Sequence, residues 1–77
     1  MGGDFMIYFK MTTAENFASF VDAETGVVVF VDSFDNIEFD VRIGSFLETK
    51  PLGSIKAKDD KTLNIKLANI YQQSIQT

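Results

Sequence analysis

The chain has no cysteine, no histidine and no tryptophan, and it has a single proline among 77 residues. Without cysteine it cannot form a disulfide, and without cysteine or histidine it has neither thiolate nor imidazole ligands for a metal. The same absences exclude cysteine nucleophiles and every arrangement in which histidine activates serine or cysteine. Carboxylates, lysine, tyrosine and hydroxyl groups remain, a small set for catalysis. We therefore expect a protein that is not an enzyme and has no cofactor.

The length suits one small domain, and we expect residues 1–77 to form it. A core of this size supplies little surplus stability, and disulfides cannot add to it. Eight phenylalanines and two tyrosines are a large aromatic content for so short a chain. We therefore expect part of this apolar surface to be buried between the subunits of a homo-oligomer, assembled as a ring through strand-edge pairing.

The net charge of −4 conceals two halves of opposite sign. Residues 1–40 have eight acidic side chains and one basic, a balance of −7, whereas residues 41–77 have six basic and three acidic, a balance of +3. This asymmetry is compatible with one acidic and one basic surface, and equally with ordinary solvation of a polar surface. Because the whole chain is acidic, any binding of nucleic acid has to be local.

The first third of the chain predicts a strand and then a helix. The apolar stretch in residues 1–11 is too short for a signal peptide or a membrane span, so we expect a cytoplasmic protein with no membrane partner. That stretch predicts a possible extra strand over residues 4–10 instead. Thr12 and Glu15 have the spacing of a capping box, and apolar residues then recur every three or four positions up to Val21. This pattern predicts a helix within residues 12–24, ended by Gly26.

The remainder of the chain predicts strands. Residues 27–31 are a run of apolar, mostly β-branched side chains, and residues 37–43 alternate apolar with charged side chains. We expect Gly44 to bend the second of these strands and residues 50–53 to interrupt the chain. A last hairpin is predicted over residues 55–67, with Lys58 opposite Thr62 and Lys56 opposite Asn64. Its outer face would present Lys56, Lys58, Asn64 and Lys66.

These elements predict a mainly β (α+β) fold, in which a short N-terminal helix precedes a bent, five-stranded antiparallel small barrel over residues 26–68. Residues 69–77 are left as a tail, either a continued strand or a frayed end. The helical stripe and the strand alternation converge on one predicted core, which comprises Phe17, Val21, Val29, Phe39, Val41, Ile55, Ile65 and Leu67.

The segment from Gly53 to Asn69 resembles the first signature of the Sm/LSm family. That signature is matched by the run Asp60-x-x-Leu63-Asn64-Ile65-x-Leu67-x-Asn69, in which x is any residue. The family's plan, an N-terminal helix on a bent five-stranded barrel in a ring of subunits, also resembles the architecture predicted above. The second signature, an apolar run into Arg-Gly, is missing after the hairpin, and Val41-Arg42-Ile43-Gly44 echoes it upstream.

This resemblance implies an Sm-like protein that binds single-stranded RNA or DNA around the inner rim of the ring, with a role in RNA or DNA processing. Asp60, Lys61 and Asn64 match the motif positions that hold a base, and the lysines would neutralise phosphates. Phe34 and Tyr71 are candidates for base stacking, although such residues serve more often in a core or an interface. The nucleic-acid-binding residues expected in this way are Asp60, Lys61, Asn64, Lys58, Lys56 and Arg42.

Two other functions fit the same sequence. The first is a small acidic protein-binding module, with an acidic surface made by Asp32, Asp35, Glu38 and Asp40. The second is a structural assembly subunit that binds no nucleic acid. A calcium site at residues 32–38 is disfavoured, because EF-hand spacing and its glycine are missing. Asp59 and Asp60 are adjacent, which is typical of a turn rather than of an acid/base pair.

Overall fold

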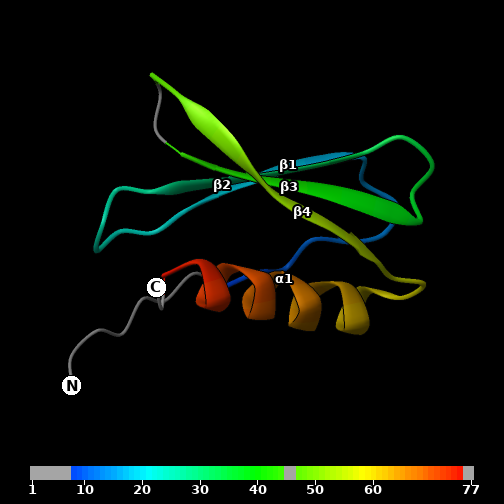
Figure 1. Cartoon of the computed structure of the whole chain (residues 1–77). Helices are drawn as coiled ribbons and strands as arrows, with labels where there is room; N and C mark the ends of the chain where they lie inside the picture. Colours follow the sequence, from blue (N-terminus) through cyan, green and yellow to red (C-terminus); the bar gives the residue numbers. More distant parts are fainter. Residues whose placement is uncertain (1–7, 45–46, 76–77) are drawn as a thin grey trace.

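A computed structural model describes residues 8–44 and 47–75. Four antiparallel strands form one open sheet in chain order, and a single helix follows them. The elements are β1 (Phe17–Val21), β2 (Val28–Ser33), β3 (Glu38–Gly44), β4 (Thr49–Lys56) and α1 (Asp60–Ile75). Helix α1 lies along one face of the sheet (Figure 1). The predicted five-stranded barrel with an N-terminal helix is therefore wrong: the described residues form an open sheet with a C-terminal helix.

Helix α1 occupies the segment in which we expected the last hairpin. The Asp59 carboxylate accepts a hydrogen bond of 2.7 Å from the Thr62 amide, and this caps the first turn. Leu63, Leu67 and Tyr71 then recur every four residues and are buried. The predicted pairs Lys58–Thr62 and Lys56–Asn64 do not exist, because residues 60–67 also fit a helical period, which buries Leu63 and Leu67 against the sheet.

The predicted helix at residues 12–24 is also wrong. Its capping contacts do form, since the Thr12 amide donates to the Glu15 carboxylate at 2.8 Å and the Glu15 amide donates to the Thr12 carbonyl at 3.1 Å. They close an isolated turn that leads into β1, because the next residues pair with β2. Of the possible extra strand at residues 4–10, residues 4–7 lie outside the described residues, and residues 8–10 are not in a strand.

Strands β2 and β3 confirm the two strands predicted at residues 27–31 and 37–43. Val29 and Val31 on β2 and Phe39 and Val41 on β3 are fully buried. The two strands are paired in register, with Val31 opposite Val41. Asn36 in the turn between them adopts a left-handed conformation with φ 61°, which asparagine tolerates better than most residues.

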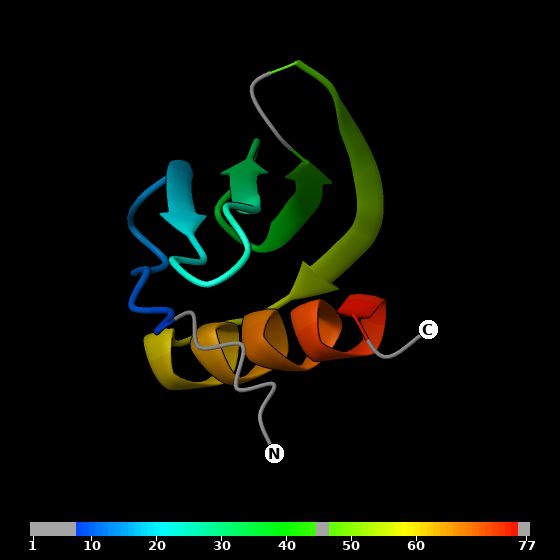
Figure 2. The ribbon, with the colours of Figure 1, turned by 90° about the vertical axis from the view of Figure 1, so that its left-hand side faces the viewer.

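Strand β4 runs through the segment that we expected to interrupt the chain. Pro51 lies in the strand, opposite Arg42, and the pairing shifts at a bulge beside it. The position is compatible with proline because β4 is an edge strand, where a missing amide costs no ladder hydrogen bond. Beyond the bulge β4 curves towards α1 (Figure 2). This curvature brings the chain across to the start of the helix.

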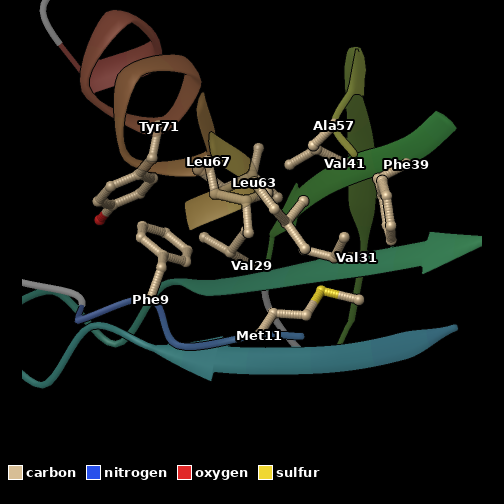
Figure 3. Close-up of a cluster of buried hydrophobic side chains, with 11 residues drawn as sticks. Phe9, Met11, Val29, Val31, Phe39, Val41, Ala57, Leu63, Leu67 and Tyr71 are labelled. Carbon is tan, nitrogen blue, oxygen red and sulfur yellow. The ribbon is translucent and has the colours of Figure 1, made fainter. Parts of the chain in front are cut away.

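The core lies between the sheet and α1 (Figure 3). Of the eight predicted core residues, Val29, Phe39, Val41 and Leu67 are buried and Ile55 is half-buried. Phe17, Val21 and Ile65 are more than half exposed, because the first two lie on a strand that the prediction made helical and the third lies on a helix that it made a strand. The side chains that complete this core come from elsewhere, and include Phe9, Met11, Ala57, Leu63 and Tyr71.

Candidate functional site: the open face of the sheet

The face of the sheet that points away from α1 has no helix over it among the described residues (Figures 1 and 2). Strand alternation determines which side chains it displays, because the core residues of β2 and β3, which begin with Val29 and Phe39, point to the helix. The residues that alternate with them point away from it, although Val28 among them is buried. The side chains displayed on the open face of the first three strands are Phe17, Ser19 and Val21, then Phe30 and Asp32, then Glu38, Asp40 and Arg42.

One side of this face is apolar. Phe17 and Val21 on β1 are 55% and 62% exposed, and Phe30 on β2 is half-buried beside them. Phe30 lies opposite Ser19, so the apolar side chains continue from β1 to β2. Sequence reasoning missed this patch because it counted Phe17 and Val21 as core. The alternation of Phe17, Ser19 and Val21 with the inward Ala18 and Phe20 was the signal available.

The other side of the face is acidic. Asp32 on β2 lies directly opposite Asp40 on β3, and Glu38 is two residues from Asp40 on the same strand face. Carboxylates in directly opposite positions repel each other. The Arg42 guanidinium is 3.3 Å from the Asp32 carboxylate, whereas the Asp40 carboxylate has no ion-pair or hydrogen-bond partner among the described residues. The acidic patch, defined by Asp32, Glu38 and Asp40, is therefore only partly neutralised.

Arg42 joins the two sides. Its guanidinium carbon is 5.7 Å from the centre of the Phe30 ring, within range of a cation–π contact, while its Nη2 faces Asp32. The side chains of Arg42 and Asp32 are each 42% exposed, so water screens this pair strongly. Of the nucleic-acid-binding residues predicted from sequence, Arg42 lies within the open face, and Lys56 lies at its margin, at the end of β4 and opposite Glu38.

Three lysines gather in a different place, the lysine hollow, which lies at the connection from β4 to α1. Lys56, Lys58 and Lys66 line this hollow of about 410 Å³ together with Ile37 and other residues of the connection. The Lys66 ammonium also donates a hydrogen bond of 2.7 Å to the Lys56 carbonyl. Lys61 is exposed on the first turn of α1. The structure thus brings together lysines that we had assigned to one hairpin face.

Asp60 and Asn64, the other two predicted site residues, hold the N-terminal segment onto α1. The Asn64 side-chain oxygen accepts from the Met11 amide at 2.8 Å, and its nitrogen donates to the Met11 carbonyl at 2.9 Å. The Asp60 carboxylate accepts from the Thr13 amide at 2.8 Å. These polar groups are engaged within the chain and are separate from the lysine hollow.

Asp22 and Tyr71 form a buried polar pair that sequence reasoning did not single out. The Tyr71 hydroxyl donates to the Asp22 carboxylate at 2.6 Å, and the other carboxylate oxygen accepts from the Glu24 amide at 2.8 Å. The hydrogen bond from Tyr71 lowers the pKa of Asp22, against the opposing effect of burial. Burial, reinforced by that hydrogen bond, raises the pKa of Tyr71 to about 12. Tyr71 is therefore part of the core, whereas Phe34, the other candidate for stacking, is fully exposed at the β2–β3 turn.

The described residues also bear on the predictions about metal binding and membrane association. Within residues 8–44 and 47–75, no three acidic side chains are grouped so that they could hold a metal ion. In residues 32–38, which were considered as a calcium site, the Asp35 carboxylate accepts hydrogen bonds from the Ile37 and Glu38 amides of its own turn. The one described helix is neither long nor apolar enough to cross a membrane.

No protein-family model, no curated protein and no solved structure matches the chain.

Proposed function

We propose that the protein is a small acidic protein-binding module, and that the open face of its sheet binds a basic segment of another protein. The observation that carries this proposal is that an apolar patch and the acidic patch lie side by side on one uncovered face. Exposed apolar side chains on β1 adjoin a row of carboxylates on β2 and β3. The partner that suits this face has apolar side chains flanked by arginine or lysine.

The two patches have different roles in such a complex. Phe17, Val21 and Phe30 provide apolar area whose removal from water drives association. Asp40 has no cationic partner among the described residues, so a lysine or arginine from outside can approach it without displacing one. Because this carboxylate is exposed, its contribution falls as salt rises. Binding is therefore expected to be both apolar and sensitive to ionic strength.

Nucleic acid suits the open face poorly, because its phosphates would meet the acidic patch. The basic groups that could hold phosphates lie at the lysine hollow, in which Lys56, Lys58 and Lys66 meet. An oligonucleotide would accordingly bind there. The two classes of partner thus engage different residues, and one experiment distinguishes them.

The experiment is a fluorescence-anisotropy titration of the purified protein with two labelled probes, a peptide of alternating arginine and leucine and an oligo(U) strand. We expect the peptide to bind, and its affinity to fall about tenfold or more in Asp40→Lys, because a like charge replaces an attractive one. Glu24→Lys is the matched control. It makes the same change in net charge at an exposed position in the β1–β2 hairpin, so it should bind the peptide nearly as the parent does.

Two results would contradict the proposal. One is equal weakening of peptide binding by Asp40→Lys and Glu24→Lys, which indicates attraction to net charge rather than to a site. The other is tight, salt-dependent binding of oligo(U) that Lys58→Ala weakens and Asp40→Lys does not, with no binding of the peptide. That result would establish nucleic-acid binding at the lysine hollow instead.

A further inference from the structure

The outer edge of β1 has backbone groups that no described strand pairs. The Asn16 carbonyl accepts from the Ser33 amide, and the Asp22 amide donates to the Val27 carbonyl. The even-numbered residues of β1 therefore direct their backbone groups towards β2. In an antiparallel ladder the residues between them point the opposite way. The amides and carbonyls of Phe17, Ser19 and Val21 are thus directed away from the sheet.

This edge has none of the features that normally prevent one strand from pairing with another. Its sequence, Phe17-Ala-Ser-Phe-Val21, has no charge and no proline. The opposite edge, β4, has Lys50, Pro51 and Lys56 and is interrupted by a bulge. Charged residues, proline and bulges are the usual protections of exposed edges. The two edges are therefore unequal, and β1 is the one able to accept a further strand.

We propose that β1 pairs antiparallel with β1 of a second copy of this chain, and that the two-fold axis passes between the two copies of Ser19. About this axis Ser19 lies opposite its own copy and Phe17 lies opposite Val21, so the interface is self-complementary. Each of these pairs consists of residues whose free backbone groups point outwards, and each can exchange both backbone hydrogen bonds. The pairing also joins the exposed aromatic and β-branched side chains of the two copies.

The charges near the ends of β1 support the same register. On this axis Glu15 lies opposite Ala23 and Glu24 lies opposite Ala14, so no two carboxylates are directly opposed. A shift of the axis to residue 18 would place Phe17 opposite Ser19 and Val21 opposite Glu15, and the apolar pairs would be lost. The register centred on Ser19 is thus the one that matches apolar with apolar side chains.

The consequence is a dimer with one continuous sheet, in the strand order β4-β3-β2-β1-β1-β2-β3-β4. A two-fold axis perpendicular to the sheet places both helices on the same side, so the two open faces merge. This inference goes beyond the proposed binding function and does not depend on it. The heterologous pairing of β1 with β4 that a ring would need is blocked by the proline and the bulge of β4.

The test uses cysteine substitutions and sedimentation velocity. Directly opposite residues in a hydrogen-bonded pair have Cα atoms about 5.5 Å apart, within the usual disulfide range of about 4.4–6.8 Å. Because the parent has no cysteine, Ser19→Cys should form a single species of covalent dimer on mild oxidation. Gln73→Cys is the matched control, since Gln73 is exposed on α1 beside the β4 side of the molecule and should not cross-link in the same conditions.

The parent should sediment with twice the mass of one chain at tens of micromolar, and Ser19→Lys should sediment with the mass of one chain. That variant opposes two ammonium groups at the axis, while the exposed position of Ser19 leaves the folded monomer intact, which circular dichroism checks. A parent that sediments as one chain overturns the inference. So does a dimer that persists in Ser19→Lys, or cross-linking of Ser19→Cys no faster than that of Gln73→Cys.

Discussion

Asp22 and Tyr71 join the β1–β2 hairpin to the last third of α1 through one short hydrogen bond. Both residues are almost completely buried, so solvent cannot replace either partner if the other is lost. Asp22 also orders its own hairpin, because its carboxylate accepts from the Glu24 amide and its carbonyl accepts from the Gly26 amide. A single side chain thus fixes the hairpin and ties it to the helix.

The pKa values of this pair predict how stability depends on pH. The pKa of Asp22 is lower in the folded state than its ordinary value of 3.8, so its contribution is present above that value and is lost as the pH falls below it. The pKa of Tyr71 is raised from 10.0 to about 12, so its contribution is present below pH 10 and is lost as the pH rises through that range. Urea unfolding across the pH range measures both losses.

The variant for this prediction is Tyr71→Phe, which removes the hydroxyl and keeps the ring. It should lower the free energy of unfolding at neutral pH by about 1–3 kcal/mol, because one oxygen of the buried Asp22 carboxylate loses the donor that Tyr71 provides. It should also abolish the alkaline loss of stability. Tyr8→Phe is the control, since Tyr8 is 80% exposed. Equal effects of the two substitutions would show that the buried hydrogen bond is not their cause.

Asn64 has a similar role at the other end of α1. Its amide satisfies both backbone groups of Met11, a residue that is 1% exposed. Asn64→Ala should therefore lower the free energy of unfolding by about 1–3 kcal/mol, measured by urea titration, because two backbone groups lose their partner. Asn69→Ala, at an exposed position on the same helix, should change it by less than about 0.5 kcal/mol. A smaller loss for Asn64→Ala than for Asn69→Ala would refute this role.

At the scale of elements, β2 and β3 could be predicted because their local patterns and their tertiary environment agree. The β-branched run in β2 and the alternation of Phe39 and Val41 with Glu38 and Asp40 both require a sheet with one buried face. For β1 the evidence conflicted. Thr12 and Glu15 make the contacts of a helix cap, and only pairing with β2 determines that a strand follows.

The error at α1 has a comparable origin. Leu63, Ile65 and Leu67 satisfy a period of two, while Leu63, Leu67 and Tyr71 satisfy a helical period. The Asp59 cap and the length of the second pattern indicate a helix, whereas the hairpin prediction relied on the period of two alone. The exposure of Ile65 distinguishes the strand period from the helical period, because a helix directs this side chain away from the sheet and leaves it 52% exposed.

The unequal burial of Leu67 and Ile65 predicts unequal losses of stability when each is replaced by alanine. Leu67→Ala should lower the free energy of unfolding by about 2–5 kcal/mol, because it leaves a cavity in the core. Ile65→Ala on the same segment should change it by less than about 1 kcal/mol, because the side chain is largely in water. Chemical denaturation of both variants measures the two values. Similar large losses would favour the hairpin, in which both residues face inwards.

At the scale of the whole molecule, the two oppositely charged halves of the chain are only partly separated in space. The position of Glu38 and Asp40 on one face follows from alternation and could be predicted. That Asp32 lies opposite Asp40 depends on the register of β2 and β3, which the turn between them determines and the composition does not reveal. The lysine hollow could not be predicted from the sequence either, because it forms only when α1 places Lys66 beside the end of β4.

The order of the elements also has a consequence for synthesis on the ribosome. All four strands precede α1, and the inner face of the sheet is covered by Leu63, Leu67 and Tyr71 from that helix. A nascent chain whose strands have emerged therefore presents Val29, Val31, Phe39 and Val41 to solvent or to a chaperone until the helix has left the exit tunnel. Folding of this domain is expected to be completed only after its translation, in one step that docks α1.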